Sequence, residues 1–213
     1  MIQVAQSKGH SITSVFDIGA NTGRWTAEYS KKIPTAQFFL FEANPVHQRP
    51  THLNKKHKWF NAVLSSPNKP EVDFFSISGT GDSYYKEQTP AYNSCTPVCM
   101  RTTTLDAVVE THSLPLPQVI KFDTQGSELD IVQGATKVMQ HVDIAVVEMS
   151  FIPYNKGAPL IDDYISAFAQ MQFVPVGVEG VHFADNILAQ IDIVFVQKDV
   201  KCKFYGDKHV API

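Results

Sequence analysis

Val15-Phe-Asp-Ile-Gly-Ala-Asn-Thr-Gly23 and Phe38-Phe-Leu-Phe-Glu42-Ala-Asn-Pro45 are the stretches that decide the fold. Each begins as a buried apolar strand; the first runs into a glycine turn and the second ends in a carboxylate. Gly19 and Gly23 let the backbone approach a ligand closely. Glu42 follows Gly23 by 42 − 23 = 19 residues, the spacing of an acid that binds ribose hydroxyls. The two stretches therefore predict a strand–helix–strand unit that binds a nucleoside, and an adenosyl compound is the expected ligand.

The composition is that of an ordinary globular domain. Of the 213 residues, 44% are hydrophobic and 11% aromatic, enough for one sizeable core, so we expect a single domain over residues 1–213. Lys and Arg number 18 against 21 Asp and Glu, so no overall field attracts nucleic acid or anionic lipid. Residues 1–10 hold no apolar run of signal-peptide length, and no stretch is apolar enough to span a membrane. We therefore expect a cytoplasmic protein without nucleic-acid or membrane partners, whose oligomeric state stays open.

The positions of cysteine and histidine predict no metal site. The three cysteines are an odd number, and Cys95 and Cys99 are separated by three residues instead of the two of a common zinc knuckle, which favours free thiols. The eight histidines contain no His-Glu-x-x-His pair. A divalent ion shared by Asp123, Glu148 and substrate oxygens would escape this test and stays open.

Short apolar runs alternate with amphipathic segments from Val15 onwards, which predicts a mainly parallel α/β sheet with helices on both faces. Seven strands are expected, near 15–19, 37–42, 59–64, 118–123, 143–149, 173–178 and 191–197. Helices are expected at 22–32, 45–56, 127–140 and 159–171. A further hairpin-like strand at 71–77 is expected to extend the unit after the third strand, and the long polar connection at 78–104 is interpreted as a binding loop.

The last two strands are too close in sequence for a helical crossover, so they predict an antiparallel hairpin at the end of the parallel sheet. A dinucleotide-binding protein uses Gly-x-Gly-x-x-Gly to hold pyrophosphate at a helix N-terminus. Here the second and third of these positions are Asn21 and Arg24. A Rossmann-like sheet that ends in a hairpin, with a turn lacking those glycines, is typical of methyltransferases that consume S-adenosylmethionine.

Three blocks of sequence resemble the FkbM-type S-adenosylmethionine-dependent methyltransferases, over approximately residues 13–197. The first block joins 15–23 to Phe41-Glu42-Ala-Asn-Pro45. The second joins Thr104-Leu-Asp106 to Ile120-Lys-Phe-Asp-Thr-Gln-Gly-Ser-Glu128, and the third is Val146-Val-Glu148. The second block is the most particular to this family. Members often carry Glu where this chain has Gln125, which puts in doubt any role that needs a charge there.

The resemblance implies methyl transfer to oxygen, typically a hydroxyl on a sugar, polyketide or other natural product, so the expected acceptor is a small molecule or glycan. Such a reaction needs the acceptor oxygen in line behind the methyl carbon, and a base or metal that helps the hydroxyl to lose its proton. Asp123 ends the fourth strand and is expected to orient the acceptor or take its proton. The other expected catalytic residues are Gln125, Glu128, Glu148 and His182.

The residues expected to bind S-adenosylmethionine lie mainly at the ends of strands. They are Asp17, Gly19, Ala20, Asn21, Gly23, Glu42, Ala43, Asn61, Ala62, Val63, Ser83 and Asp123. Structural interpretations stay open for three acids: Asp17 could satisfy amides of its own turn, Glu128 could only stabilise a helix N-terminus, and Glu148 could pair with a core cation. Two other functions also stay open, an NAD-dependent oxidoreductase and a non-catalytic nucleoside-binding module with the same fold.

Overall fold

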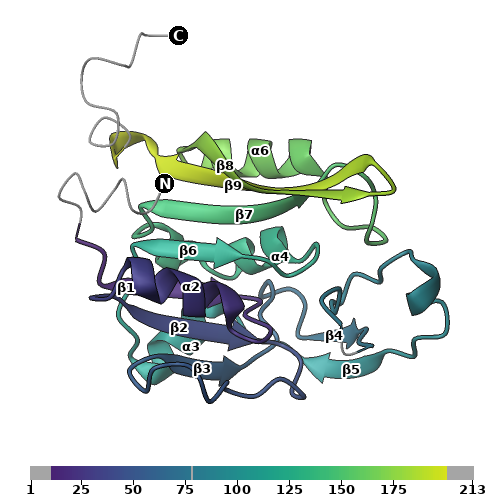
Figure 1. The fold of residues 1–213 in the computed structure, drawn as a ribbon, viewed down its shortest axis with the longest axis horizontal. Coiled ribbons are helices and arrows are strands. Elements are labelled where there is room, and N and C mark those ends of the chain that lie inside the picture. Colours follow the sequence, from purple (N-terminus) through teal and green to yellow (C-terminus); the bar gives the residue numbers. More distant parts are fainter. Residues whose placement is uncertain (1–10, 78, 201–213) are drawn as a thin grey trace, which may run out of the picture.

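The structure, a computed structural model, describes residues 11–77 and 79–200. Within these ranges seven strands form the main sheet: β1 (Ser14–Ile18), β2 (Gln37–Glu42), β3 (Lys58–Asn61), β6 (Val119–Phe122), β7 (Ile144–Ser150), β8 (Phe173–Ala184) and β9 (Ile187–Gln197). Their order is β3-β2-β1-β6-β7-β9-β8 (Figure 1). The first five in this order are parallel, whereas β9 runs antiparallel to both β7 and β8. The predicted Rossmann-like α/β fold with a C-terminal hairpin is confirmed.

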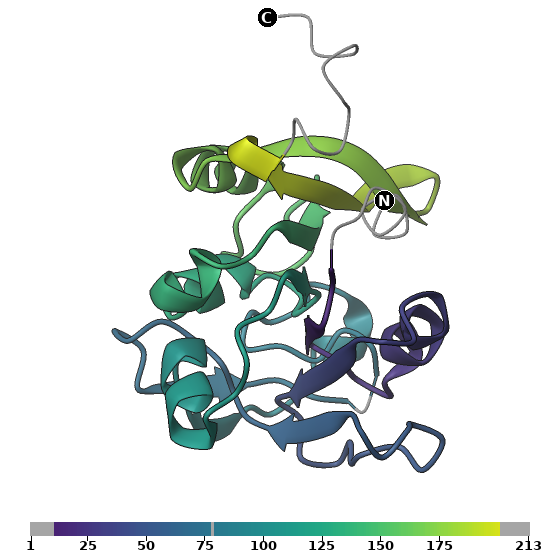
Figure 2. The same cartoon turned by 90° about the vertical axis from the view of Figure 1, so that its left-hand side faces the viewer.

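Helices cover both faces of the sheet (Figure 2). They are α2 (Arg24–Lys32) on one face, and α3 (Leu105–His112), α4 (Glu128–Gln133), α5 (Thr136–Met139) and α6 (Ile161–Gln170) on the other. Successive residues of a strand point to opposite faces, so a sheet covered on both sides needs strands that are apolar throughout. Phe38 accordingly packs on the α2 side and Phe39 on the α3–α6 side. This explains why most of the parallel strands read as mainly apolar runs.

The β8–β9 hairpin is longer than predicted. Asp185 and Asn186 form a two-residue connection with φ of 48° and 63°, the left-handed conformation that tight hairpin turns use. β8 therefore continues past its expected end at 178, and β9 begins before its expected start at 191. β8 contains three register irregularities against β9, which bend this edge strand.

One predicted helix is absent and another is divided into two. No helix forms over 45–56, because Pro50 lacks an amide hydrogen and cannot sit in a helix interior; the segment is a series of turns. The helix expected at 127–140 is divided into α4 and α5 at Gly134, which is a weak helix former. The Ser65 carbonyl lies so close to this position that a side chain there would collide with it. Helix α3 is not among the predicted elements; Thr104 caps it by accepting a 3.2 Å hydrogen bond from the Ala107 amide.

The strand expected at 71–77 does not extend the main sheet. It is the shorter β4 (Glu71–Phe74), which pairs with β5 (Val98–Arg101) in a separate antiparallel sheet. The long connection also holds a 3₁₀ turn, η1 (Pro90–Tyr92). Among the described residues Cys95 and Cys99 are free thiols; Cys202 and residues 1–10, on which other sequence expectations fall, lie outside the described ranges. Among the described residues, no helix has the length and apolar character needed to cross a membrane.

The order of strands reverses between β1 and β6, because the chain passes from β1 to β2 on one side and adds β6 on the other. In open α/β sheets a crevice forms at such a point, outside the carboxyl ends of the strands. Gly19 follows β1 with φ of 79°, and it packs so closely against the Asp123 carbonyl that a side chain at position 19 would collide with it. The ends of β1 and β6 thus meet at this crevice.

Candidate active site

A cavity of about 630 Å³ opens at the carboxyl ends of the parallel strands. Most of the predicted site residues line it: Gly19, Ala20, Asn21, Glu42, Ala43, Ala62, Val63, Ser83, Asp123, Gln125, Glu148 and His182. Four predicted residues do not line it, namely Asp17, Gly23, Asn61 and Glu128. The cavity therefore brings together residues from strand ends that are far apart in sequence.

The turn after β1 forms the floor at one end of the cavity. The amides of Gly19 and Ala20 donate hydrogen bonds of 2.9 and 3.0 Å to the Phe41 carbonyl, which ties the turn to the end of β2. Gly19, Asn21 and Gly23 all have positive φ, which glycine and asparagine tolerate best. Gly23 keeps this conformation below the cavity surface, against the side chains of Leu53 and Leu40.

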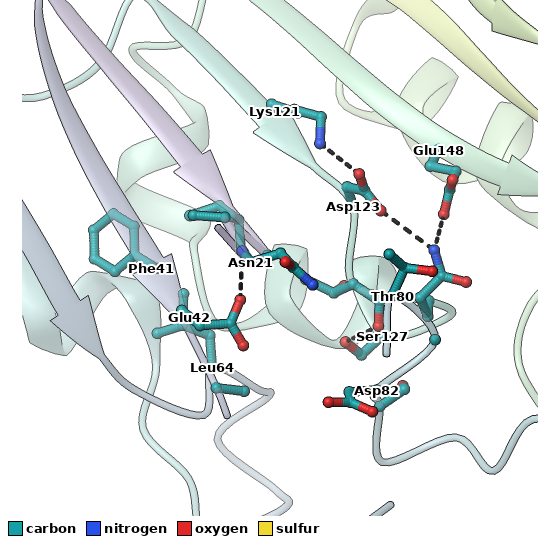
Figure 3. A pocket seen from close by; sticks show the side chains of 18 of the residues that line it. Asn21, Phe41, Glu42, Leu64, Thr80, Asp82, Lys121, Asp123, Ser127 and Glu148 are labelled. Carbon is teal, nitrogen blue, oxygen red and sulfur yellow. Dashed lines mark hydrogen bonds and ion pairs between the residues drawn. The ribbon is translucent and has the colours of Figure 1, made fainter. Parts of the chain in front are cut away.

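Glu42 ends β2 and is 7% exposed, at the cavity wall (Figure 3). Its two carboxylate oxygens accept hydrogen bonds from the amides of Asn21 (2.7 Å) and Asn44 (2.8 Å). Burial raises the pKa of Glu42 above its usual value, and the two amide hydrogen bonds oppose that rise. A carboxylate offers about four lone-pair positions, so this fixed side chain can still accept hydrogen bonds from a ligand.

Apolar residues form the wall beside Glu42. Ala43 follows β2, and Ala62, Val63 and Leu64 follow β3. Asn61, in contrast, is exposed and does not line the cavity: it donates to the His47 carbonyl (3.0 Å) and accepts from the Trp59 indole (3.2 Å). Of the segment 61–63 expected to form this wall, residues 62 and 63 line the cavity together with Leu64, and Asn61 does not.

Asp17 is fully buried beneath the turn and does not reach the cavity surface. Its Oδ2 accepts a 2.6 Å hydrogen bond from the Thr26 hydroxyl, at the start of α2, whereas no residue within the described ranges bonds Oδ1. Burial raises the pKa of Asp17, and the nearby Lys121 ammonium opposes the rise. Asp17 therefore fixes the start of α2 against β1. It also accepts a hydrogen bond from the Thr26 backbone amide, in line with the interpretation in which it satisfies nearby amides.

The end of β6 carries an ion pair. Lys121 Nζ lies 2.5 Å from Asp123 Oδ2, with the lysine side chain buried and about a third of the aspartate side chain exposed. Burial alone would raise the pKa of Asp123, but the Lys121 ammonium lowers it below the usual range. Lys121 was missed as a site residue; a lysine inside the apolar run Val119–Phe122 was the available signal, since a buried charge needs a partner.

Gln125 links Asp123 to Glu148. Its amide nitrogen lies 3.3 Å from Asp123 Oδ1 and 2.5 Å from Glu148 Oε2, and Gln190 also donates to Glu148 Oε2 at 3.1 Å. Burial raises the pKa of Glu148 well above its usual value, and the Asp123 carboxylate raises it further. An amide can donate to both carboxylates, so the uncharged Gln125 suits its position between them.

Glu128 is fully buried and organises the backbone behind the cavity. Its carboxylate accepts hydrogen bonds from the amides of Thr124 (2.7 Å) and Gly126 (3.0 Å), and from the Tyr164 hydroxyl (2.5 Å). Burial raises the pKa of Glu128, and these donors oppose the rise. The geometry therefore gives Glu128 a structural role in the turn that presents Asp123 and Gln125.

The long loop closes the remaining side of the cavity with Thr80, Gly81, Asp82, Ser83 and Tyr84. The backbone of Ser83 exchanges two hydrogen bonds with that of Phe75, at 2.8 and 3.1 Å. The Asp82 carboxylate accepts from Asn44 and Ser76, both at 2.8 Å. These bonds hold the loop against the end of β2.

Comparison with known proteins gives three findings. The family model described as "Methyltransferase FkbM domain" matches residues 17–175. A hexuronic acid methyltransferase, AglP, from Haloferax volcanii is 28% identical over 142 residues, which cover 63% of this chain and 55% of the relative. The chain thus spans about half the length of that curated relative. The crystal structure of magnesium protoporphyrin IX methyltransferase (ChlM) from Synechocystis PCC 6803 with bound SAH has a TM-score of 0.50 at 7% identity, covering 92% of this chain and 79% of that chain. This likeness shows a shared fold.

Proposed function

Because this chain belongs to the family of the Methyltransferase FkbM domain, we propose that it transfers a methyl group from S-adenosylmethionine to a hydroxyl oxygen of a sugar, glycan or other small molecule. The observation that carries this proposal is that Glu42 and Asp123 line one cavity, at the ends of β2 and β6. The cavity volume of about 630 Å³ lies within the usual range of small-molecule sites.

The residues at the Glu42 end suit the adenosine part of the methyl donor. Glu42 can accept hydrogen bonds from two ribose hydroxyls, because its own amide partners leave lone pairs free. Ala62, Val63 and Leu64 supply an apolar wall for a flat base. S-adenosylmethionine would supply a methyl group on a cationic sulfur, which leaves as a neutral thioether when the acceptor oxygen attacks the methyl carbon and loses its proton.

The residues at the Asp123 end suit a hydroxyl-bearing acceptor. Lys121 keeps Asp123 ionised, so this carboxylate can accept a hydrogen bond from the acceptor hydroxyl and orient its oxygen. The same lowered pKa makes Asp123 a weak base, which favours orientation over full proton removal. Gln125 and Gln190 add amide groups that can bond further hydroxyls. The name of the Haloferax relative, a hexuronic acid methyltransferase, supports a sugar acceptor.

Calorimetric titration with S-adenosylmethionine, S-adenosylhomocysteine and NAD tests the donor. We expect micromolar binding of both adenosyl compounds and none of NAD, with binding weakened in Glu42→Gln. A change at exposed Glu71, on β4 and away from the cavity, is the matched control. Methyl transfer is then assayed with labelled donor and a panel of neutral sugars and hexuronic acids.

Two outcomes would contradict the proposal. Binding of NAD without either adenosyl compound would indicate an oxidoreductase. Binding of the adenosyl compounds by a protein that transfers no methyl group to any hydroxyl of the panel would favour a non-catalytic nucleoside-binding module.

A further inference from the structure

Glu148 on β7 and Asp192 on β9 lie directly opposite each other in an antiparallel strand pair. Residues in this relation have Cβ atoms roughly 5 Å apart, and two like charges at such positions destabilise a sheet. Glu148 is 8% exposed, so water screens this repulsion poorly. Both side chains line the cavity. The pair therefore calls for a positive charge between the two carboxylates.

His182, on the neighbouring strand β8, completes a set of three. One carboxylate oxygen each of Glu148 and Asp192 and one ring nitrogen of His182 all lie within 4.8 Å of one another. His182 Nε2 is 3.5 Å from Asp192 Oδ2, which is long for a hydrogen bond. The amide hydrogen bonds to Glu148 from Gln125 and Gln190 both fall on Oε2, so neither occupies Oε1.

Gly180 leaves space over this group. It pairs with Asp192 in the β8–β9 register, and a Cβ at position 180 would collide with the Asp192 carboxylate and approach the His182 ring. The φ of Gly180 is not positive, so the backbone conformation alone does not require glycine at this position. The missing side chain therefore keeps the carboxylate and the imidazole open towards each other.

The charges around Glu148 are unbalanced. Besides Asp192, the carboxylates of Asp123 and Glu128 act on it, and the buried Lys121 ammonium is already bonded to Asp123. Burial and these neighbouring carboxylates together raise the pKa of Glu148. A cation bound between Glu148 and Asp192 would restore the balance.

We propose that Glu148, His182 and Asp192 bind a divalent transition-metal ion such as Mn²⁺. Two carboxylate oxygens and one imidazole nitrogen are suitable ligands, and three protein ligands leave coordination positions open to the cavity. A role for the ion in methyl transfer rests on the proposed function: a hydroxyl oxygen of the acceptor bound at an open position would lose its proton more readily, while Asp123 orients it. This would supply the help with proton loss that Asp123 gives only weakly.

Binding of Mn²⁺ alone to metal-stripped protein tests the site without any methyl donor. Isothermal titration calorimetry, together with the loss of the free Mn²⁺ signal in electron paramagnetic resonance, should show one ion per chain. We expect Asp192→Asn and His182→Ala each to weaken binding by roughly tenfold or more. Gly180→Ala should weaken binding without removing a ligand. Asp73→Asn, which changes an exposed carboxylate on β4, should leave it unchanged.

The site is disproved if Mn²⁺ fails to bind at low millimolar concentration, or if it binds equally well to Asp192→Asn and His182→Ala. His182 is about half exposed, so its replacement does not threaten folding, and thermal unfolding of each variant checks this. Because Mn²⁺ binding needs no S-adenosylmethionine, a protein that binds the ion but transfers no methyl group would refute the proposed function and leave the metal site standing.

Discussion

The backbone amide of Asn21 donates a 2.7 Å hydrogen bond to Oε2 of Glu42. Asn21 holds this amide in a left-handed conformation, with φ of 47°, between two glycines that also have positive φ. The bond joins the turn after β1 to the acid that ends β2. The geometry of the turn and the position of the expected ribose acceptor therefore depend on one side chain.

Replacing Glu42 with Gln should weaken S-adenosylmethionine binding by about 10- to 100-fold, because a hydrogen bond to a charged group contributes about 1.5–3 kcal/mol. The glutamine amide group cannot accept from Asn21 and Asn44 with both of its polar atoms, so the turn also loses one bond. Titration calorimetry measures the affinity, with Glu71→Gln as control. Equal affinities in wild type and Glu42→Gln would remove Glu42 from the cofactor site.

Replacing Asp123 with Asn should lower turnover by roughly 100-fold while leaving the affinity for S-adenosylmethionine within a few-fold. The side chain keeps its size, and the backbone carbonyl that packs on Gly19 is unchanged. Buried Lys121 loses its bonded carboxylate but keeps the charge of Asp17 nearby, so the fold should survive. Single-turnover methyl transfer at saturating donor is the measurement. Unaltered turnover in the variant would exclude Asp123 from the reaction.

Most parallel strands of the main sheet were predictable because they are short, mainly apolar runs, as a sheet covered on both faces requires. The positions of the residues at strand ends followed from the same pattern: Glu42 and Asp123 both line the cavity. The helix expected at 45–56 does not form because Pro50 lies in its interior. Helix α3 was overlooked; it begins at Leu105, directly after the long connection at 78–104.

Side-chain direction was harder to predict than strand position. Glu128 and Glu148 both belong to the sequence blocks that resemble the FkbM family. Glu128 nevertheless turns back to accept hydrogen bonds from the amides of its own loop, whereas Glu148 reaches the cavity. The pairing of Glu148 with Asp192 depends on the register of β9 against β7, which local sequence does not specify. Asn61 lies one position before the cavity wall, within the uncertainty of a strand boundary.

Replacing Gly19 with Ala should destabilise the protein by about 2–4 kcal/mol, because it combines a strained positive φ with a collision against the Asp123 carbonyl. Gly157→Ala is the matched control: this residue has φ of 77° but no atom within 4 Å of an added Cβ. It should therefore show only the cost of the backbone strain, about 1 kcal/mol. Urea unfolding of both variants measures the difference. Equal losses would mean that the contact between the ends of β1 and β6 is not tight.

Replacing Glu128 with Ala should cost about 3 kcal/mol or more of unfolding free energy, because two buried amides and the Tyr164 hydroxyl lose their acceptor. Tyr164→Phe removes one of these bonds and should cost less. In the double variant the losses should not add, since the two changes remove the same Tyr164–Glu128 bond. Urea unfolding of the three proteins provides the cycle. A Glu128→Ala protein of full stability but without activity would instead assign Glu128 to catalysis.

His57 should make the stability of the fold depend on pH between about 6.5 and 4. Its ring is buried, and Nδ1 accepts a 3.1 Å hydrogen bond from the Phe38 amide, so a proton on that nitrogen would break the bond. Burial, and then the charges of Lys56 and Arg49, lower the pKa of His57 from 6.5 to about 4. The unfolded chain therefore takes up the proton first, and the unfolding free energy should be fully present above pH 6.5 and fall by roughly 2–3 kcal/mol as the pH drops towards 4. His57→Asn keeps an acceptor for the Phe38 amide but cannot titrate, so urea unfolding should show a shallower pH dependence in this variant than in wild type or in the exposed control His52→Asn. If all three proteins lose the same stability on acidification, the decline belongs to other groups.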